Sequence, residues 1–298
     1  MKSQNICKKG PWLENIIHVF SGDGRYSDYI KPFNDIGLYV ETDTKNKSMV
    51  IEIPREKKDK VVFKDLLNTK EFKKTTCKLP LLLGCDVFGN PVIKDLDTMP
   101  NLFVGGKCGS GKSVLLKNIY ESLTAKLNKD ECKFVIIDPK AFDFMKYSKK
   151  KNMLMPVITE IDDAMKFFDE IAEIIDCRKN IIRNKNSKEC KNMPKIVIII
   201  DELIDLLFGN KNQTEKFFQL VGTYGRSVGV HLIAATQRGD HISSLIYANT
   251  PTKICFNVRN RADSRINLGE DGAELLLPIG DMLYSESGRI PMRIHCGN

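Results

Sequence analysis

A glycine-rich segment ends in a lysine and a serine at residues 106–113, GKCGSGKS, and fits the pattern G-x-x-x-x-G-K-[ST]. An apolar run, NLFVG at 101–105, precedes it, and a helix-like run follows it. Glycines let successive backbone N–H groups face a phosphate, and the start of a helix adds the positive end of its dipole. The lysine would neutralise β- and γ-phosphate oxygens, and the serine hydroxyl would bind Mg²⁺. The residues expected to hold the nucleotide are Gly106, Gly109, Ser110, Gly111, Lys112, Ser113 and Val114.

An acidic pair follows a second apolar run, IVIIIDE at 196–202. Asp201 stands at the carboxyl end of this expected strand, where it could hold the Mg²⁺ shell. Glu202, directly after it, could orient and polarise a water for ATP hydrolysis. A structural alternative is that Glu202 merely begins a helix, where the helix dipole favours an acidic side chain.

The segment between these two motifs narrows the class of nucleotide-binding protein. KFVIID at 133–138 predicts an additional strand, as in RecA-like ATPases, and no guanine-reading N-K-x-D is present. Thr236 ends another apolar run, VHLIAAT at 230–236, and Gln237 follows it. At the end of that strand the Gln237 amide would lie beside the γ-phosphate and could sense it. The predicted nucleotide is therefore ATP.

Apolar runs alternate with amphipathic helical stretches from Leu79 onward, which is typical of a parallel sheet with crossover helices. We expect residues 79–298 to form an α/β, RecA-like P-loop NTPase domain with a mainly parallel sheet and helices on both faces. Residues 1–78 are expected to form a small N-terminal α+β appendage. Its first 33 or so residues are interpreted as a loosely ordered lead-in, and two short strands are predicted around a polar turn at 43–47, followed by a short helix.

Composition excludes several classes of protein. The 298 residues contain no apolar run near the roughly 18 to 20 residues that cross a bilayer, so we expect no intrinsic membrane segment and a cytoplasmic location. The nine cysteines are scattered singly without a C-x-x-C, which gives little support to a zinc site or a disulfide framework. A net charge of +8 permits a polyanionic partner but is weak evidence by itself.

Several longer stretches resemble one family. LLLGCDVFGNPVIKDLDTMPNLFVGGKCGSGKSV, IIDPK, IVIIIDELIDLL, GRSVGVHLIAATQR, LIYANTPTKICFNV and GAELLLPIGDMLY, within residues 51–295, look like the motor domain of FtsK/SpoIIIE-type DNA translocases. The resemblance implies a homo-oligomeric ring, usually a hexamer, that threads double-stranded DNA and hydrolyses ATP at subunit interfaces with Mg²⁺.

The resemblance also implies roles for single residues. Lys112 and Ser113 match the phosphate loop, Asp201 and Glu202 match the second motif, and Gln237 matches the sensor. Lys140, in IIDPK, matches a family lysine, although a surface or salt-bridge role fits it equally. Arg178, in EIIDCRKNII, is the first candidate for an arginine that acts in a neighbouring subunit's site. The remaining expectations concern two reserve arginines, Arg265 and Arg226, and two DNA contacts in a pore loop, Arg238 and His241.

Differences between this chain and typical members of the family leave its biological setting open. Typical members carry N-terminal membrane helices and a C-terminal winged helix, and neither is expected here. The host process would be chromosome partition or the transfer of a plasmid, conjugative element, transposon or phage, with a transfer or division machinery as partner. Two alternatives remain: an FtsK-like ATPase of a protein-secretion system, and a non-motor ATP-binding module, against which the intact Glu202 argues.

Overall fold

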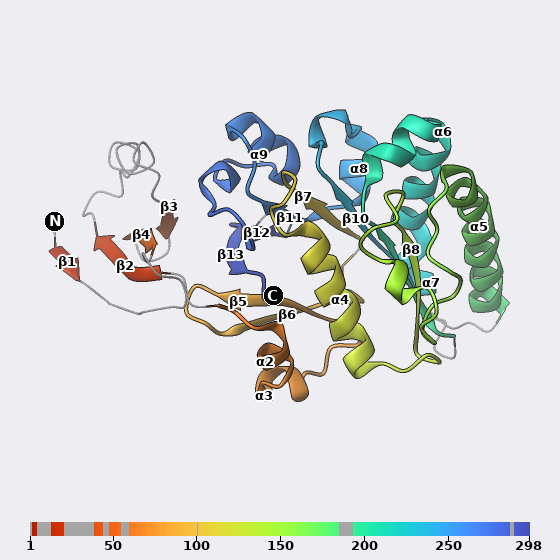
Figure 1. Ribbon diagram of the computed structural model, residues 1–298, viewed down its shortest axis with the longest axis horizontal. Coiled ribbons are helices and arrows are strands. Elements are labelled where there is room, and N and C mark those ends of the chain that lie inside the picture. Colours follow the sequence, from red (N-terminus) through yellow and green to blue (C-terminus); the bar gives the residue numbers. More distant parts are fainter. Residues whose placement is uncertain are drawn as a thin grey trace.

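The computed structural model describes residues 2–4, 13–20, 39–43, 48–54, 60–99, 101–184, 193–286 and 289–298. These residues form one four-stranded and one nine-stranded sheet (Figure 1). The candidate site lies on the larger sheet.

The nine-stranded sheet has a parallel core with an antiparallel extension. Its strands are β5 (Pro80–Asp86), β6 (Pro91–Asp95), β7 (Leu102–Gly105), β8 (Cys132–Ile137), β9 (Lys195–Ile200), β10 (Val230–Thr236), β11 (Thr252–Phe256), β12 (Asp281–Ser285) and β13 (Met292–His295). They run in the order β6-β5-β13-β12-β11-β7-β10-β9-β8. Strands β11, β7, β10, β9 and β8 are parallel, and the other four continue the sheet in antiparallel fashion. The carboxyl ends of β7, β9 and β10 therefore meet at one edge.

Helices cover both faces of this sheet (Figure 1). They are α4 (Lys112–Lys126), α5 (Ile161–Asn184), α6 (Leu203–Leu220), α7 (Arg226–Val228), α8 (Ser244–Asn249) and α9 (Arg261–Leu268), with a π-helical turn at Val221–Gly225 and 3₁₀ turns at Met145–Tyr147, Gly239–His241 and Ala273–Leu275. Because strand side chains alternate between faces, Leu102 and Val104 of β7 join the core cluster that contains Leu115 of α4. Phe103 joins the opposite cluster, which contains Ile171 of α5.

The predicted fold class is confirmed: the sheet is mixed, with a parallel core and helices on both faces. The five strands expected from apolar runs correspond to β7, β8, β9, β10 and β11. None of the helices in the described ranges is both long enough and apolar enough to cross a membrane.

The four-stranded sheet comprises β1 (Lys2–Gln4), β2 (Leu13–Phe20), β3 (Tyr39–Asp43) and β4 (Ser48–Pro54), all antiparallel in the order β1-β2-β4-β3. The prediction of two strands around a polar turn matches β3 and β4, and residues 44–47 of the turn lie outside the described residues. Within the stretch interpreted as a loosely ordered lead-in, the structure has β1 and β2, and β2 pairs with β4 with a register shift between Leu13 and Asn15. The rest of the lead-in lies outside the described residues.

Helices α2 (Phe63–Leu67) and α3 (Lys70–Lys73) fall in the expected appendage but pack on the nine-stranded sheet. Phe63 and Phe72 share a buried cluster with Leu82 of β5. The backbone N–H of Phe63 donates to the carbonyl of Asn298 at 3.0 Å, which ties α2 to the end of the chain. The expected boundary at residue 78 thus separates α2 and α3 from the strand on which they pack.

Candidate nucleotide-binding and catalytic site

The loop between β7 and α4 is built on glycines in the left-handed region of backbone space. Gly106, Gly109 and Gly111 have φ values of +146°, +72° and +119°. A side chain at Gly106 would also approach Cβ of Phe256 to 2.7 Å. The loop can curl over the carboxyl end of β7 only with residues that lack a Cβ.

Lys112, the first residue of α4, points back into this loop. Its buried Nζ donates to the carbonyls of Gly106 at 2.7 Å and Lys107 at 2.9 Å. Burial lowers the pKa of Lys112 to about 8, although Glu202 and Asp201 raise it. The hydroxyl of Ser110 is buried and has no hydrogen-bond partner among the described residues. A phosphate oxygen is the kind of group that an orphan hydroxyl and a lysine inside a glycine loop would bind.

Ser113 and Asp201 form the polar pair expected at a magnesium site. The hydroxyl of Ser113 donates to Oδ1 of Asp201 at 3.2 Å. Burial, and then the charges of Asp138 and Asp143, raise the pKa of Asp201 to about 6, while Ser113 and Lys140 lower it. A cation would relieve this repulsion. Within the described residues no three His, Cys, Asp or Glu side chains could hold a metal together, but Mg²⁺ with a nucleotide uses one or two protein oxygens, phosphates and waters. The residues therefore fit Mg²⁺.

Glu202 is held by three donors. Its Oε1 accepts hydrogen bonds from the Thr236 hydroxyl at 3.0 Å and from the Gln237 backbone N–H at 3.1 Å. Its Oε2 forms an ion pair with Nζ of Lys140 at 3.0 Å. Burial lowers the pKa of Lys140, but the hydrogen bond and charge of Glu202 outweigh it and the net shift is upward. Glu202 is the N-cap residue of α6, as the helix-start alternative expects, but its carboxylate makes no capping hydrogen bond and is bonded to the end of β10 and to Lys140 instead.

One cavity of about 440 Å³ brings most of the predicted nucleotide residues together. Gly109, Gly111, Lys112, Ser113, Val114, Asp201 and Gln237 line it. Gly106 and Ser110 belong to the loop beneath it. Phe142 and Ile279, which sequence reasoning missed, line the same cavity and are 90% and 59% exposed. Ile279 lies within GAELLLPIGDMLY, so the resemblance contained a signal for it, whereas Phe142 had none.

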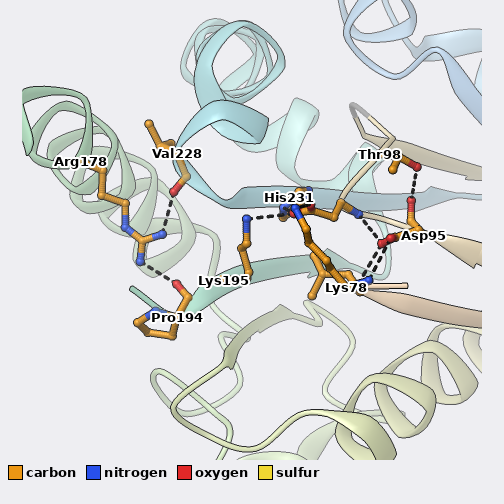
Figure 2. Close-up of polar contacts among 10 residues, drawn as sticks. Lys78, Asp95, Thr98, Arg178, Pro194, Lys195, Val228 and His231 are labelled. Carbon is orange, nitrogen blue, oxygen red and sulfur yellow. Dashed lines mark hydrogen bonds and ion pairs between the residues drawn. The ribbon is translucent and has the colours of Figure 1, made fainter. Parts of the chain in front are cut away.

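Arg178 lies in a different environment from the one expected (Figure 2). Its side chain is buried, and its two terminal nitrogens donate to the carbonyls of Val228 and Pro194, each at 2.9 Å. Those carbonyls precede β10 and β9, at the edge of the sheet opposite the cavity. A guanidinium fixed in this way argues against a role in a neighbouring site.

The reserve arginines are both exposed. Nε and one terminal nitrogen of Arg265 donate to the two carboxylate oxygens of Asp271, at 2.6 and 2.8 Å. The guanidinium of Arg226 makes no hydrogen bond or ion pair with the described residues. Of the three candidates, only Arg226 is both exposed and unengaged in the described structure.

The expected DNA contacts follow β10. Arg238 is exposed and lines a second cavity of about 380 Å³, together with Lys107 and Arg259. His241 lies 3.5 Å from a carboxylate oxygen of Asp240, and its ring centre is 5.8 Å from that of Phe208. Beside the phosphate loop this cavity thus brings three cationic side chains together with two acidic ones, Asp240 and Asp263.

Comparison with known proteins settles the family. The FtsK/SpoIIIE family model matches residues 63–193. The protein named DNA translocase FtsK from Treponema pallidum is 38% identical over 261 residues, which cover 82% of this chain and 33% of that protein. The chain belongs to the FtsK/SpoIIIE family. The protein of the same name from Clostridium tetani, DNA translocase FtsK, is 35% identical over 274 residues, which cover 86% of this FtsK/SpoIIIE-family chain and 37% of that protein. The chain thus spans about a third of the length of the curated relatives it matches.

Solved structures agree with this family fold. The conjugation coupling protein TcpA of pCW3, in its monomer form with ATPγS, has a TM-score of 0.69 and 21% identity, covering 99% of this chain and 87% of that chain. The cytoplasmic domain of the type VII secretion ATPase EccC from Thermomonospora curvata has a TM-score of 0.70 and 21% identity, covering 80% of this chain and 32% of that chain. At these identities the likeness concerns the fold alone.

Proposed function

We propose that this FtsK/SpoIIIE-family ATPase hydrolyses ATP to move double-stranded DNA as a ring-shaped motor. One juxtaposition supports the proposal most: the glycine loop, the acidic pair and Gln237 converge at the carboxyl edge of β7, β9 and β10. Relatives that share this segment at 38% and 35% identity are named DNA translocases. Because both ATP and DNA would be substrates, we propose that the protein acts in the cytoplasm.

The chain's own groups divide the work of hydrolysis. Lys112 and the loop N–H groups would bind the phosphates, and Ser113 with Asp201 would hold Mg²⁺. When bound, Mg²⁺ neutralises charge on the phosphate oxygens. Glu202 would accept a proton from the attacking water, and the Gln237 side chain would contact the terminal phosphate.

The loop at Arg238 and His241 would contact DNA phosphates without reading bases. The neighbouring Lys107 and Arg259 add charge of the same sign, and Asp240 and Asp263 in the same cavity add charge of the opposite sign. We propose a hexameric ring around the duplex, and a setting in plasmid, conjugative or phage-associated transfer with a transfer or division machinery as partner. A secretion ATPase is the second candidate, because EccC shares the fold.

The deciding experiment is ATPase activity with duplex DNA, single-stranded DNA or no DNA. Duplex should stimulate turnover, equally for unrelated sequences, and the stimulation should fall steeply as salt rises because phosphate contacts release counterions. A secretion ATPase would be indifferent to DNA, and a non-motor module would be inactive throughout. Either result would reject the proposed function.

A further inference from the structure

The carboxylate of Glu202 accepts hydrogen bonds that its proposed role as general base does not require. We propose that Thr236 and Lys140 are positioning residues that hold Glu202 in a resting pose, and that the DNA-contacting loop beginning at Arg238 releases it. This inference rests on the proposed function, because it treats Glu202 as the base and the loop as the DNA contact.

The contacts form a continuous chain from the carboxylate to the loop. Thr236, at the end of β10, is fully buried, and its one hydroxyl proton goes to Oε1 of Glu202. The same oxygen of Thr236 accepts the backbone N–H of Arg238 at 3.2 Å. Since Gln237 N–H also donates to Glu202, two successive peptide groups of the loop are tied to the catalytic carboxylate, directly and through Thr236.

In this pose Glu202 is poorly placed to serve water in the nucleotide cavity. A general base needs a free lone pair within hydrogen-bond distance of the proton it takes. Here donors occupy three of the roughly four lone-pair sites of the carboxylate, two on Oε1 and one on Oε2, and the residue is only 2% exposed. Glu202 does not line the 440 Å³ cavity; it lines a smaller one of about 270 Å³ that shares Lys140 and Gln237 with it. The carboxylate must leave this arrangement to act.

The loop that begins at Arg238 can transmit a displacement of Arg238 to Glu202. Arg238 is exposed, whereas the next residue, Gly239, is buried and its carbonyl accepts the hydroxyl of Tyr247 at 3.0 Å. Displacement of Arg238 by a phosphate is therefore confined to the Gln237 and Arg238 peptide groups, the two that hold Glu202 and Thr236. DNA engagement would free the base only in subunits that grip the duplex.

The test is the ratio of duplex-stimulated to DNA-free turnover. Thr236→Val removes the hydroxyl with little change of shape, and we expect DNA-free kcat to rise by about 10-fold because a hydrogen bond to a charged group is lost. The ratio should fall accordingly, with KM for ATP unchanged. Thr236→Ser keeps the hydroxyl and should restore the wild-type ratio. Lys140→Met, at a side chain 43% exposed, should also lower the ratio without threatening the fold.

A matched control is Thr250→Val, which removes an equally buried hydroxyl that donates to the carbonyl of Ile246 at 2.9 Å. Its ratio should equal that of the wild type. If Thr236→Val and Lys140→Met lower DNA-free and stimulated rates by the same factor, the positioning role is rejected. If the wild type is not stimulated by duplex while Thr236→Val still raises DNA-free turnover, the proposed function fails and the hold on Glu202 stands.

Hydrogen exchange gives a readout independent of turnover. In nucleotide-free protein, the peptide covering 236–241 should exchange faster in Thr236→Val than in the wild type, and faster in the wild type with duplex than without. Unchanged exchange in both comparisons would overturn the proposal.

Discussion

Lys112 and Glu202 belong to one site but carry separable steps. Lys112→Ala should abolish nucleotide binding, because the buried ammonium of the phosphate loop is lost. Glu202→Gln should still bind ATP but hydrolyse it at least ~100-fold more slowly, because an amide cannot take a proton from water. Titration with a fluorescent ATP analogue measures the first effect, and single-turnover hydrolysis measures the second.

Lys129→Ala, at an exposed lysine beyond the end of α4, is the matched control and should leave both measurements unchanged. Near-normal turnover of Glu202→Gln with duplex present would show that another group is the base.

At the level of residues, the sequence located those parts of the site that depend on short spacing. Gly106 to Ser113 are consecutive, and Asp201 ends an apolar run, so local pattern alone predicts their place. The partners of Glu202 could not be found in this way, because Thr236 lies 34 positions further along the chain and meets Glu202 only when β9 and β10 pair. Arg178 was selected from a short resemblance, which carries no information about burial against Val228 and Pro194.

Among the elements, β10 carries a buried histidine that should make stability depend on pH. His231 is fully buried, with Nε2 3.7 Å from Oδ1 of Asp97 (Figure 2 shows His231 beside Lys195). Burial lowers the pKa of His231 to about 4; Asp97 raises it and Lys195 lowers it further. The unfolded chain takes up this proton below about pH 6.5 and the folded chain only near pH 4, so stability should fall as pH drops through that window.

The expected loss from this one group is at most about 3 kcal/mol, at about 1.4 kcal/mol per pKa unit. Urea unfolding of the wild type and His231→Leu between pH 8 and pH 4 measures it. The variant should lose less stability than the wild type between pH 6.5 and 4, and both should have the same slope above pH 7. Parallel curves over the whole range would mean that His231 does not titrate in this way.

The elements themselves were predicted unevenly, for a physical reason. Strands β7 to β11 are buried on both faces and read as continuous apolar runs. Strand β6 has mostly half-buried positions, so its residues do not form a continuous apolar run. Strand β2 is defined by its pairing with β4. Pairing between distant segments leaves little trace in either segment alone, so the antiparallel extension and the first two strands required the structure.

At the scale of the whole molecule, the ATPase site still needs an arginine from a neighbouring subunit. Hydrolysis by the proposed ring would need a guanidinium near the γ-phosphate, and neither the phosphate loop nor the acidic pair contains an arginine. Arg178 is engaged inside its own subunit, and Arg265 is paired with Asp271. Arg226 is exposed and makes no such contact with the described residues, so we propose that it reaches the neighbouring subunit.

This proposal predicts that activity can be rebuilt by mixing two inactive proteins. Arg226→Ala should bind ATP yet lose hydrolysis by a factor of roughly 10³, the low end of the effect of arginine fingers. Lys112→Ala lacks nucleotide binding but keeps Arg226. Mixed rings place that intact arginine against an intact phosphate loop, so activity should reappear and pass through a maximum as the proportions vary. Arg265→Ala is the control and should be active alone. No recovery in rings shown to be mixed would reject Arg226 as the shared residue.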